Sequence, residues 1–260
     1  MTNYTKPDVW QWQNPNNEKS GNRPTAGARF EQTLPIGDAP HQVYSLGTPN
    51  GIKVAIIFEE LKALGIQAAE YNLYQINIGK GDQFGTDFVN INPNSKIPTL
   101  VDYSTEQPLY VFESGSILLY LAEKFQQFIP TDIAGRTETL NWVFWQTGAG
   151  PYIGGGFGHF FHYAPYDMEY PIERFTMETK RQLDLLDQLL SEREYITGDT
   201  YTIADMMIWP WYGRLVKGHL YNGSDKFLAV EQYHNLNRWA EQISQRPAVQ
   251  RALEVSYQPL

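Results

Sequence analysis

A short strand-turn-helix motif constrains the fold of this chain more than any other stretch. The residues Ser45-Leu46-Gly47-Thr48-Pro49-Asn50-Gly51 separate an apolar run, 43–46, from a helical pattern. Thr48 suits the N-cap, because its hydroxyl can accept from the first helical turn, and Pro49 suits the first helical position. The motif thus places Thr48 and Asn50 at a positive helix end, where an anion such as a thiolate is stabilised. A hydroxyl that only caps its own helix is the alternative.

Composition restricts the chemistry that the chain can perform. The net charge of −9 argues against a nucleic-acid groove, which needs clustered Lys and Arg. The chain contains no cysteine, so any thiol in its chemistry must come from a ligand. No apolar run is long enough for a signal peptide or a membrane span. We therefore expect a cytoplasmic protein that binds neither nucleic acid nor membranes.

The first forty residues differ from the rest of the chain. Residues 1–40 are rich in Asn, Pro and Gly and lack an apolar period, which predicts an extended arm. Trp10 and Trp12 lie in this arm, and we expect one or both to anchor it on the body of the protein. A disordered tail is the alternative.

Residues 41–128 alternate between strand and helix patterns. The expected elements are a strand at 43–46, a helix at 49–64, a strand at 70–76, a short helix at 87–91, strands at 99–103 and 109–112, and a helix that begins near 114. Ile97-Pro98 opens a strand, where proline cannot donate to the ladder, so a cis bond is one solution and a trans loop the other. Glu113 and Ser114 open the next helix, and a cap beside a solvated carboxylate is the simplest interpretation.

Residues 133–260 read as helices and loops. Helical patterns cover 133–147, 172–190 and 236–244, of which 236–244 is expected to be the last helix. Residues 148–165 read as an interruption rich in Gly and aromatic residues. Thr202 and Asp205 form a capping box that opens another helix. Pro210 falls inside that helix, where it predicts a kink or an early stop. Trp209, Trp211 and Trp239 are most simply core residues.

These features together resemble the glutathione transferase superfamily. A Thr-type turn, an Ile-Pro strand opening, a Glu-Ser helix opening and the Tyr-Thr-Ile-Ala-Asp of a helical half recur over about 42–249. The runs Gly154-Gly155-Gly156-Phe157-Gly158-His159-Phe160, Arg174-Phe175-Thr176-Met177-Glu178 and Ile208-Trp209-Pro210-Trp211 are similar to the bacterial Nu-class branch of disulfide-bond oxidoreductases, whose longer members carry an N-terminal arm. A fungal nitrogen-regulation protein shares the fold.

The resemblance implies a thioredoxin-like domain at 41–128, an all-helical domain at 133–260 and a homodimer. It implies glutathione as co-substrate, Thr48 and Asn50 as catalytic residues, and no metal. The implied glutathione contacts are Asn22, Thr48, Pro49, Asn50, Gln83, Ile97, Pro98, Glu113, Ser114 and Arg174. The backbone of Ile97 would pair with the cysteinyl unit, and Glu113 and Ser114 would hold the γ-glutamyl end. Asn22 and Arg174 would suit a second glutathione, whereas Thr147 replaces a Gln that close relatives carry.

The absence of cysteine shapes the expected reaction. Bound glutathione thiolate would attack small or peptide disulfides, and a second glutathione would resolve the mixed disulfide. Two alternatives stay open: a conjugating transferase or peroxidase that acts on electrophiles, and a non-catalytic regulatory protein that binds glutathione. Tyr152, Tyr163 and Tyr166 could line the acceptor site or pack in a core or interface, and Tyr44 is expected in the core. His159 and His162 lack a third ligand, so we expect no metal site.

Overall fold

The structure is a computed structural model that describes residues 5–12 and 23–260. Asn22 lies outside the described residues. The strands are β1 (His41–Ser45), β2 (Tyr71–Gln75), β3 (Thr99–Asp102) and β4 (Leu109–Phe112). The helices are α1 (Pro49–Ala63), α2 (Thr86–Ile91), α3 (Ser114–Phe125), α4 (Ile133–Pro151), α5 (Glu169–Leu190), α6 (Ile203–Val216), α7 (Ser224–Phe227), α8 (His234–Ser244) and α9 (Pro247–Glu254), with a π-helical segment at Tyr152–Tyr163 and 3₁₀ turns at Gln67–Ala69, Asp82–Phe84 and Val230–Gln232.

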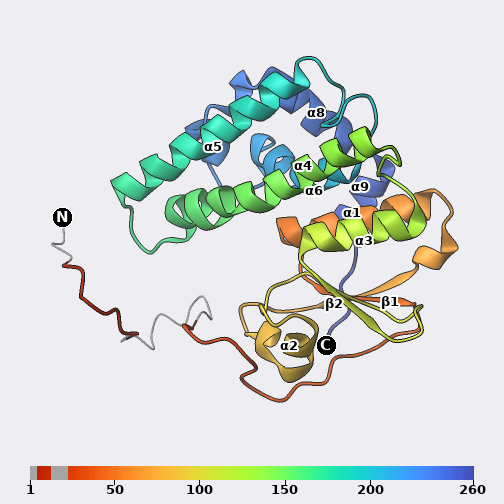
Figure 1. The fold of residues 1–260 in the computed structure, drawn as a ribbon. Helices are drawn as coiled ribbons and strands as arrows, with labels where there is room; N and C mark the ends of the chain where they lie inside the picture. The colour runs from red at the N-terminus through yellow and green to blue at the C-terminus, as the bar shows by residue number, and fades with distance from the viewer. Residues whose placement is uncertain (1–4, 13–22) are drawn as a thin grey trace.

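The four strands form one mixed sheet in the order β2-β1-β3-β4. β1 pairs with β2 in parallel, and β3 is antiparallel to both β1 and β4. Helices α1 and α3 cover one face of the sheet and α2 covers the other (Figure 1). Side chains alternate along β1, so that Val43 enters the core under α1 while Tyr44 enters the smaller core beside α2. This is the thioredoxin-like arrangement that the resemblance implied.

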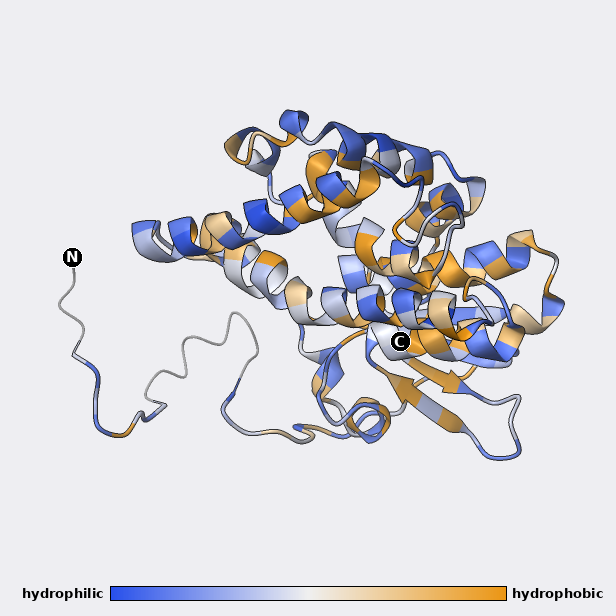
Figure 2. Ribbon diagram, turned by 45° about the horizontal axis from the view of Figure 1, so that its top comes forward, coloured by the Kyte–Doolittle hydropathy of each residue, from blue (hydrophilic) through white to orange (hydrophobic). Residues whose placement is uncertain are grey.

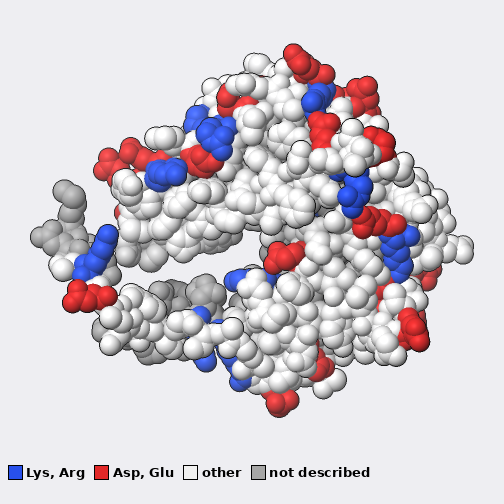
Figure 3. Space-filling view, in the orientation of Figure 1, with Lys and Arg blue, Asp and Glu red and all other residues white. Residues whose placement is uncertain are grey.

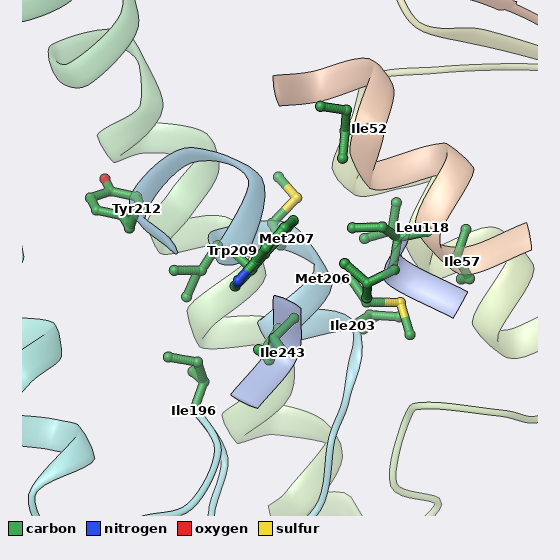
Figure 4. Close-up of a cluster of buried hydrophobic side chains, with 14 of the residues drawn as sticks. Ile52, Ile57, Leu118, Ile196, Ile203, Met206, Met207, Trp209, Tyr212 and Ile243 are labelled. Carbon is green, nitrogen blue, oxygen red and sulfur yellow. The ribbon is translucent and has the colours of Figure 1, made fainter. Parts of the chain in front are cut away.

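The helical half packs on the outer side of α1 and α3 (Figure 1). Its centre is α6, which is buried along almost its full length. Figure 4 shows Met206, Met207 and Trp209 of α6 beside Ile52 of α1 and Leu118 of α3. One continuous core therefore joins the two halves and holds them in a fixed relation around the space between them. In Figure 2 the strands are mostly hydrophobic, and the two central strands, β1 and β3, are buried along their full length.

The expected interruption at 148–165 is wrong. Helix α4 continues to Pro151, and a π-helical segment carries the helix on to Tyr163. Three of the four glycines of this segment, Gly154, Gly156 and Gly158, allow close packing and do not reverse the chain. A β-carbon on Gly154 would lie 2.7 Å from the ring of Trp211, and one on Gly156 would lie closer still to Phe175.

Two further expectations at the C-terminal end need correction. Helix α6 does not stop at Pro210 but runs through it to Val216. The helix at 236–244 is present as α8, yet it is not the last, because α9 follows at Pro247–Glu254. Pro247 occupies the first turn of α9, where its missing N–H costs nothing. The predicted capping box of Thr202 and Asp205 is confirmed.

The arm is anchored near its end and not by its tryptophans. The side chains of Trp10 and Trp12 are 62% and 43% exposed, so the expected anchor is wrong for the single chain. The backbone of Phe30 instead bridges to Gly85, and the N–H of Leu34 donates to Asp87 at 3.0 Å. In the described part of the chain, no helix is long and apolar enough to cross a membrane.

Candidate functional site

A cleft of about 1410 Å³ lies between the sheet half and the helical half. Figure 3 shows the molecule hollowed between these two halves. One wall comes from the turn before α1, the loop before β3 and the start of α3; the other comes from the end of α4, the π-helical segment and α6. Ligand pockets commonly measure roughly 300 to 1000 Å³. The cleft therefore has room for more than one small ligand.

Thr48 lies at the bottom of the sheet-side wall. Its Oγ accepts a hydrogen bond from the N–H of Gly51 at 3.4 Å, which confirms it as the N-cap of α1. Because the lone pair of the hydroxyl serves the cap, the O–H proton stays available to a group in the cleft. Thr48 thus both begins the helix and offers a donor at its positive end.

Asn50 lines the same wall, and Trp211 fixes the orientation of its amide. The indole N–H of Trp211 donates to Asn50 Oδ1 at 2.9 Å. An indole nitrogen is a donor only, so the oxygen of Asn50 must face Trp211 and its NH₂ group stays free to donate elsewhere. The expectation that Trp211 is a plain core residue is therefore wrong, because its ring is half-buried and lines the cleft. Trp209 and Trp239 are buried as expected.

The bond between Ile97 and Pro98 is cis, as one of the two interpretations required. Pro98 is buried, and Ile97 lines the cleft. Within the described part of the chain, neither the N–H nor the C=O of Ile97 has a hydrogen-bond partner. This residue therefore presents a free pair of backbone groups to an extended ligand, in the manner of a strand edge.

Glu113 and Ser114 stand together at the start of α3. Glu113 adopts φ 67° and ψ 123°, a conformation that non-glycine residues rarely adopt, and its carboxylate is exposed at the cleft. Ser114 is buried at the first position of the helix. A carboxylate beside a helix N-terminus can bind an ammonium and a carboxylate that are attached to one carbon, as in an α-amino acid.

A buried lysine that the sequence analysis missed lies beneath these residues. Lys53 is 1% exposed, and its Nζ donates to Gln146 Oε1 at 2.7 Å and to Ser114 Oγ at 3.3 Å. Burial lowers the pKa of Lys53 well below its usual range, while the nearby Glu113 carboxylate opposes this change. In the sequence, the only indication that Lys53 belongs to the site was its spacing of three residues from Asn50, which places it about one turn further along α1.

Gln83, from the 3₁₀ turn at Asp82–Phe84, also lines the cleft. Its side chain is buried, and its Oε1 has no hydrogen-bond partner among the described residues. A buried amide oxygen without a partner is costly, so a donor from a ligand would satisfy it. The exposed Lys96 also lines the cleft, next to Ile97, and adds a cation that the sequence analysis did not select.

The helical wall is aromatic. Tyr163 and Tyr166 line it, beside His159, whereas Tyr152 does not. Tyr44 is buried in the sheet, as expected, and its hydroxyl donates to the carbonyl of Pro35. No group of three or more His, Cys, Asp or Glu side chains in the described ranges is placed to hold a metal ion.

Among the described site residues that the resemblance implied, the buried Pro98 and the exposed Arg174 of α5 do not line the cleft. Asn22 lies outside the described residues. Thr147 does line it, but its hydroxyl donates to the carbonyl of Val143, so the residue before it, Gln146, provides the polar contact of this turn.

Known proteins with similar sequences and structures place this cleft in a family. The chain matches the glutathione S-transferase N-terminal domain over residues 49–124 and the C-terminal domain over residues 169–242. It is 55% identical to the disulfide-bond oxidoreductase YghU of Escherichia coli strain K12, over 95% of this chain and 86% of that protein.

Two solved structures extend the comparison. Glutathione transferase YghU from Streptococcus pneumoniae, crystallised in complex with glutathione, is 59% identical, with a TM-score of 0.96 over 99% of both chains. A glutathione transferase from Burkholderia graminis, with two glutathione molecules bound per subunit, is 39% identical, with a TM-score of 0.76 over 83% of this chain and 88% of that one. The predicted resemblance is thus confirmed: the chain belongs to the glutathione transferase family and is a homolog of the disulfide-bond oxidoreductase YghU.

Proposed function

We propose that this protein is a glutathione-dependent disulfide reductase. The observation that carries the proposal is the pair of free donors, the Thr48 hydroxyl and the Asn50 amide that Trp211 orients, at the positive end of α1. A free thiol has a pKa near about 8.5, so these donors and the helix dipole would favour the thiolate of a bound glutathione. The 55% identity to the disulfide-bond oxidoreductase YghU supports the same reaction.

The reaction proceeds in two exchanges. The thiolate of the first glutathione attacks one sulfur of a small or peptide disulfide, forms a mixed disulfide and releases the other sulfur as a thiolate. The second glutathione, as thiolate, attacks the glutathione sulfur of the mixed disulfide, which yields glutathione disulfide and the second substrate thiol. Two glutathiones lose one proton each and the two substrate thiolates gain one each, so protons and electrons balance.

The remaining expected contacts form the glutathione site of this proposal. The free backbone groups of Ile97 would pair with the cysteinyl unit, next to Pro49 and the buried Pro98. Glu113, Ser114 and the unpartnered Gln83 oxygen would hold the γ-glutamyl end. The cleft volume supports a second glutathione, for which Asn22 and Arg174 remain proposed contacts. The relative from Burkholderia graminis, with two glutathiones per subunit, agrees with this capacity.

We also propose that the protein is a homodimer, as its family implies. Large apolar side chains are exposed on and beside the edge strand β4, at Tyr103, Leu109, Tyr110 and Phe112. An unpaired apolar edge strand is a liability in an isolated chain, and a second copy would cover it. Light scattering should give roughly twice the chain mass of 29.9 kDa. A mass of one chain would contradict the dimer.

A paired steady-state assay tests the reaction. One arm supplies a small disulfide with glutathione, glutathione reductase and NADPH; the other supplies glutathione with an aromatic halide. We expect disulfide reduction to exceed conjugation, and Thr48→Ala and Asn50→Ala each to lower kcat/KM by roughly ten- to a hundredfold, because each removes one donor to a charged sulfur. Thr200→Ala, an exposed threonine remote from the cleft, is the matched control.

The same assay separates the alternatives. Faster conjugation than reduction would assign the protein to the conjugating transferases, which the aromatic wall of Tyr163 and Tyr166 would suit. Glutathione binding without turnover in either arm would assign it a regulatory role. Full disulfide reduction by both Ala variants would remove Thr48 and Asn50 from the mechanism.

A further inference from the structure

A second cavity, of about 320 Å³, lies behind the turn that carries Thr48 and Asn50. Gly47 and Ile52 line this cavity, whereas Thr48, Pro49 and Asn50 line the glutathione cleft. The turn is therefore a thin wall between two cavities. The other walls come from the end of α6, from α8, and from α9 with the residues after it.

One cation in the second cavity has no counterion. The guanidinium of Arg214 is half-buried and makes no hydrogen bond or ion pair with any described residue. Two other half-buried arginines are paired: Arg246 donates to Glu60 at 2.6 Å and Arg193 to Glu138 at 2.5 Å. Burial lowers the pKa of Arg214, but a guanidinium stays charged near neutral pH. An unpaired half-buried guanidinium is a site for an anion.

The remaining charges around the cavity do not satisfy Arg214. Lys217 and Glu241 both line it, but they pair with each other at 2.7 Å, and His219 lies beside them. The net charge of the Lys217–Glu241 pair is zero, so this pair does not compensate the positive charge of Arg214. The cavity therefore favours a ligand with one negative charge.

Much of the remaining lining is apolar, and Ser244 and His219 add polar groups. Ile52, Trp209, Leu253, Val255 and Tyr257 face the space beside Arg214. Figure 4 shows Ile52 of α1 and Trp209 of α6 in the core that joins the two halves. A pocket that combines apolar side chains with one uncompensated charge favours an apolar body with one ionised group, because an inorganic ion would leave the apolar side chains without a contact.

We propose that this cavity binds a small organic carboxylate, whose carboxylate meets the Arg214 guanidinium and whose apolar body lies against Trp209 and Val255. The planar guanidinium fits a carboxylate through two parallel hydrogen bonds. The volume suits a ligand of the size of a short fatty acid or an aromatic amino acid derivative.

The position of the cavity couples it to the glutathione cleft, a consequence that rests on the proposed function. Trp209 contributes to the second cavity, while Trp211, two residues further along α6, orients Asn50 in the cleft. Gly47 precedes Thr48 directly. A ligand that moves either segment changes the donor geometry at the thiol, so occupancy of one cavity alters affinity in the other, and reciprocally.

Calorimetric titration with hexanoate tests the proposal, with hexanamide as the neutral probe of the same shape. We expect hexanoate to bind at least tenfold more tightly than hexanamide, and Arg214→Gln to abolish that difference while Arg214→Lys retains part of it. Arg136→Gln, which removes an exposed arginine paired with Glu123 on the surface, should change neither affinity. Equal binding of the two probes, or hexanoate binding by Arg214→Gln at the strength of the unmodified protein, would overturn the site.

A second titration separates the site from the cleft. Glutathione affinity is measured at rising hexanoate concentrations, and we expect it to reach a plateau, because coupling between two sites has a finite size. A glutathione affinity that falls without limit would place hexanoate in the cleft and overturn the proposal. The hexanoate titration without glutathione does not depend on disulfide reduction, so a failure of the proposed function leaves the binding test intact.

Discussion

The two walls of the cleft are built on different principles. The sheet-side wall holds Thr48, Ile97 and Glu113, whose positions follow from a helix cap, a cis peptide bond and a backbone turn within a few residues. The helical wall presents Tyr163, Tyr166 and Trp211, whose positions depend on how α4, the π-helical segment and α6 pack. The first wall offers fixed polar groups that suit a ligand of constant structure. The second offers aromatic faces that tolerate different partners.

The largest expected effect comes from breaking the sheet-side wall at Glu113. Glu113→Gly and Glu113→Ala both remove the carboxylate that would hold the glutathione ammonium, at a cost of about 2–3 kcal/mol, or roughly 30- to 150-fold in glutathione affinity. Only the glycine variant removes the backbone strain at φ 67°. Its free energy of unfolding should therefore be up to about 1 kcal/mol higher than that of the alanine variant.

Titration calorimetry and urea unfolding measure the two quantities separately. A glycine variant that binds glutathione normally would show that Glu113 holds no part of the ligand. A glycine variant less stable than the alanine variant would show instead that the backbone at this position is unstrained.

The second effect concerns the lysine under the same wall. Lys53 is buried and its pKa is lowered, so between its folded pKa and about 10.4 the unfolded chain binds more protons than the folded protein. The free energy of unfolding therefore rises with pH in this window, by up to about 1.4 kcal/mol per pH unit. At pH values below the folded-state pKa, Lys53 is charged in its buried site and its full destabilising effect is present. Lys53→Met should remove this rise.

Urea unfolding at several pH values between 7 and 10 checks the prediction against Lys62→Met, which removes an exposed lysine from the end of the same helix. Other titrating groups contribute equally to both variants, so the difference between their slopes isolates Lys53. Parallel pH profiles for the two variants would mean that Lys53 titrates at an ordinary pKa in the folded protein.

Local sequence was enough to predict most of the sheet-side wall. A Thr-Pro pair after an apolar run specifies a strand that ends where a helix begins, and the four strands lie within two residues of their expected bounds. For the Ile97-Pro98 bond the sequence left two alternatives, cis and trans, and the structure has the cis form. These features are decided by backbone geometry over a few residues, which single residues such as Thr, Pro and Gly report directly.

The contacts that sequence reasoning missed join residues far apart in the chain. Lys53 and Gln146 are separated by 93 positions, and Asn50 and Trp211 by 161, so no local period relates them. The prediction of an interruption at 148–165, where the structure has the π-helical segment, failed for another reason. Glycine marks both turns and close approaches, and only the tertiary structure shows that Gly154 makes room for the Trp211 ring.

The smallest effect tests the hydrogen bond between Trp211 and Asn50, which joins the helical wall to the sheet-side wall. Trp211→Phe keeps an aromatic ring against Gly154 but removes the indole N–H that holds Asn50 Oδ1. The amide can then rotate and point its oxygen at the thiolate, which loses a donor part of the time. A neutral hydrogen bond contributes about 0.5–1.5 kcal/mol, so kcat for disulfide reduction should fall roughly two- to tenfold.

The pattern across kinetic constants distinguishes orientation from simple packing. If Trp211 acts through Asn50, the glutathione KM stays nearly constant, and Trp211→Phe adds little to the loss already caused by Asn50→Ala, because the two changes break the same interaction. Tyr166→Phe, on the same wall but without a hydrogen bond to the site, is the matched control. Independent, additive losses in the double variant would mean that the helical wall contributes surface alone, and the contrast between the two walls would then be complete.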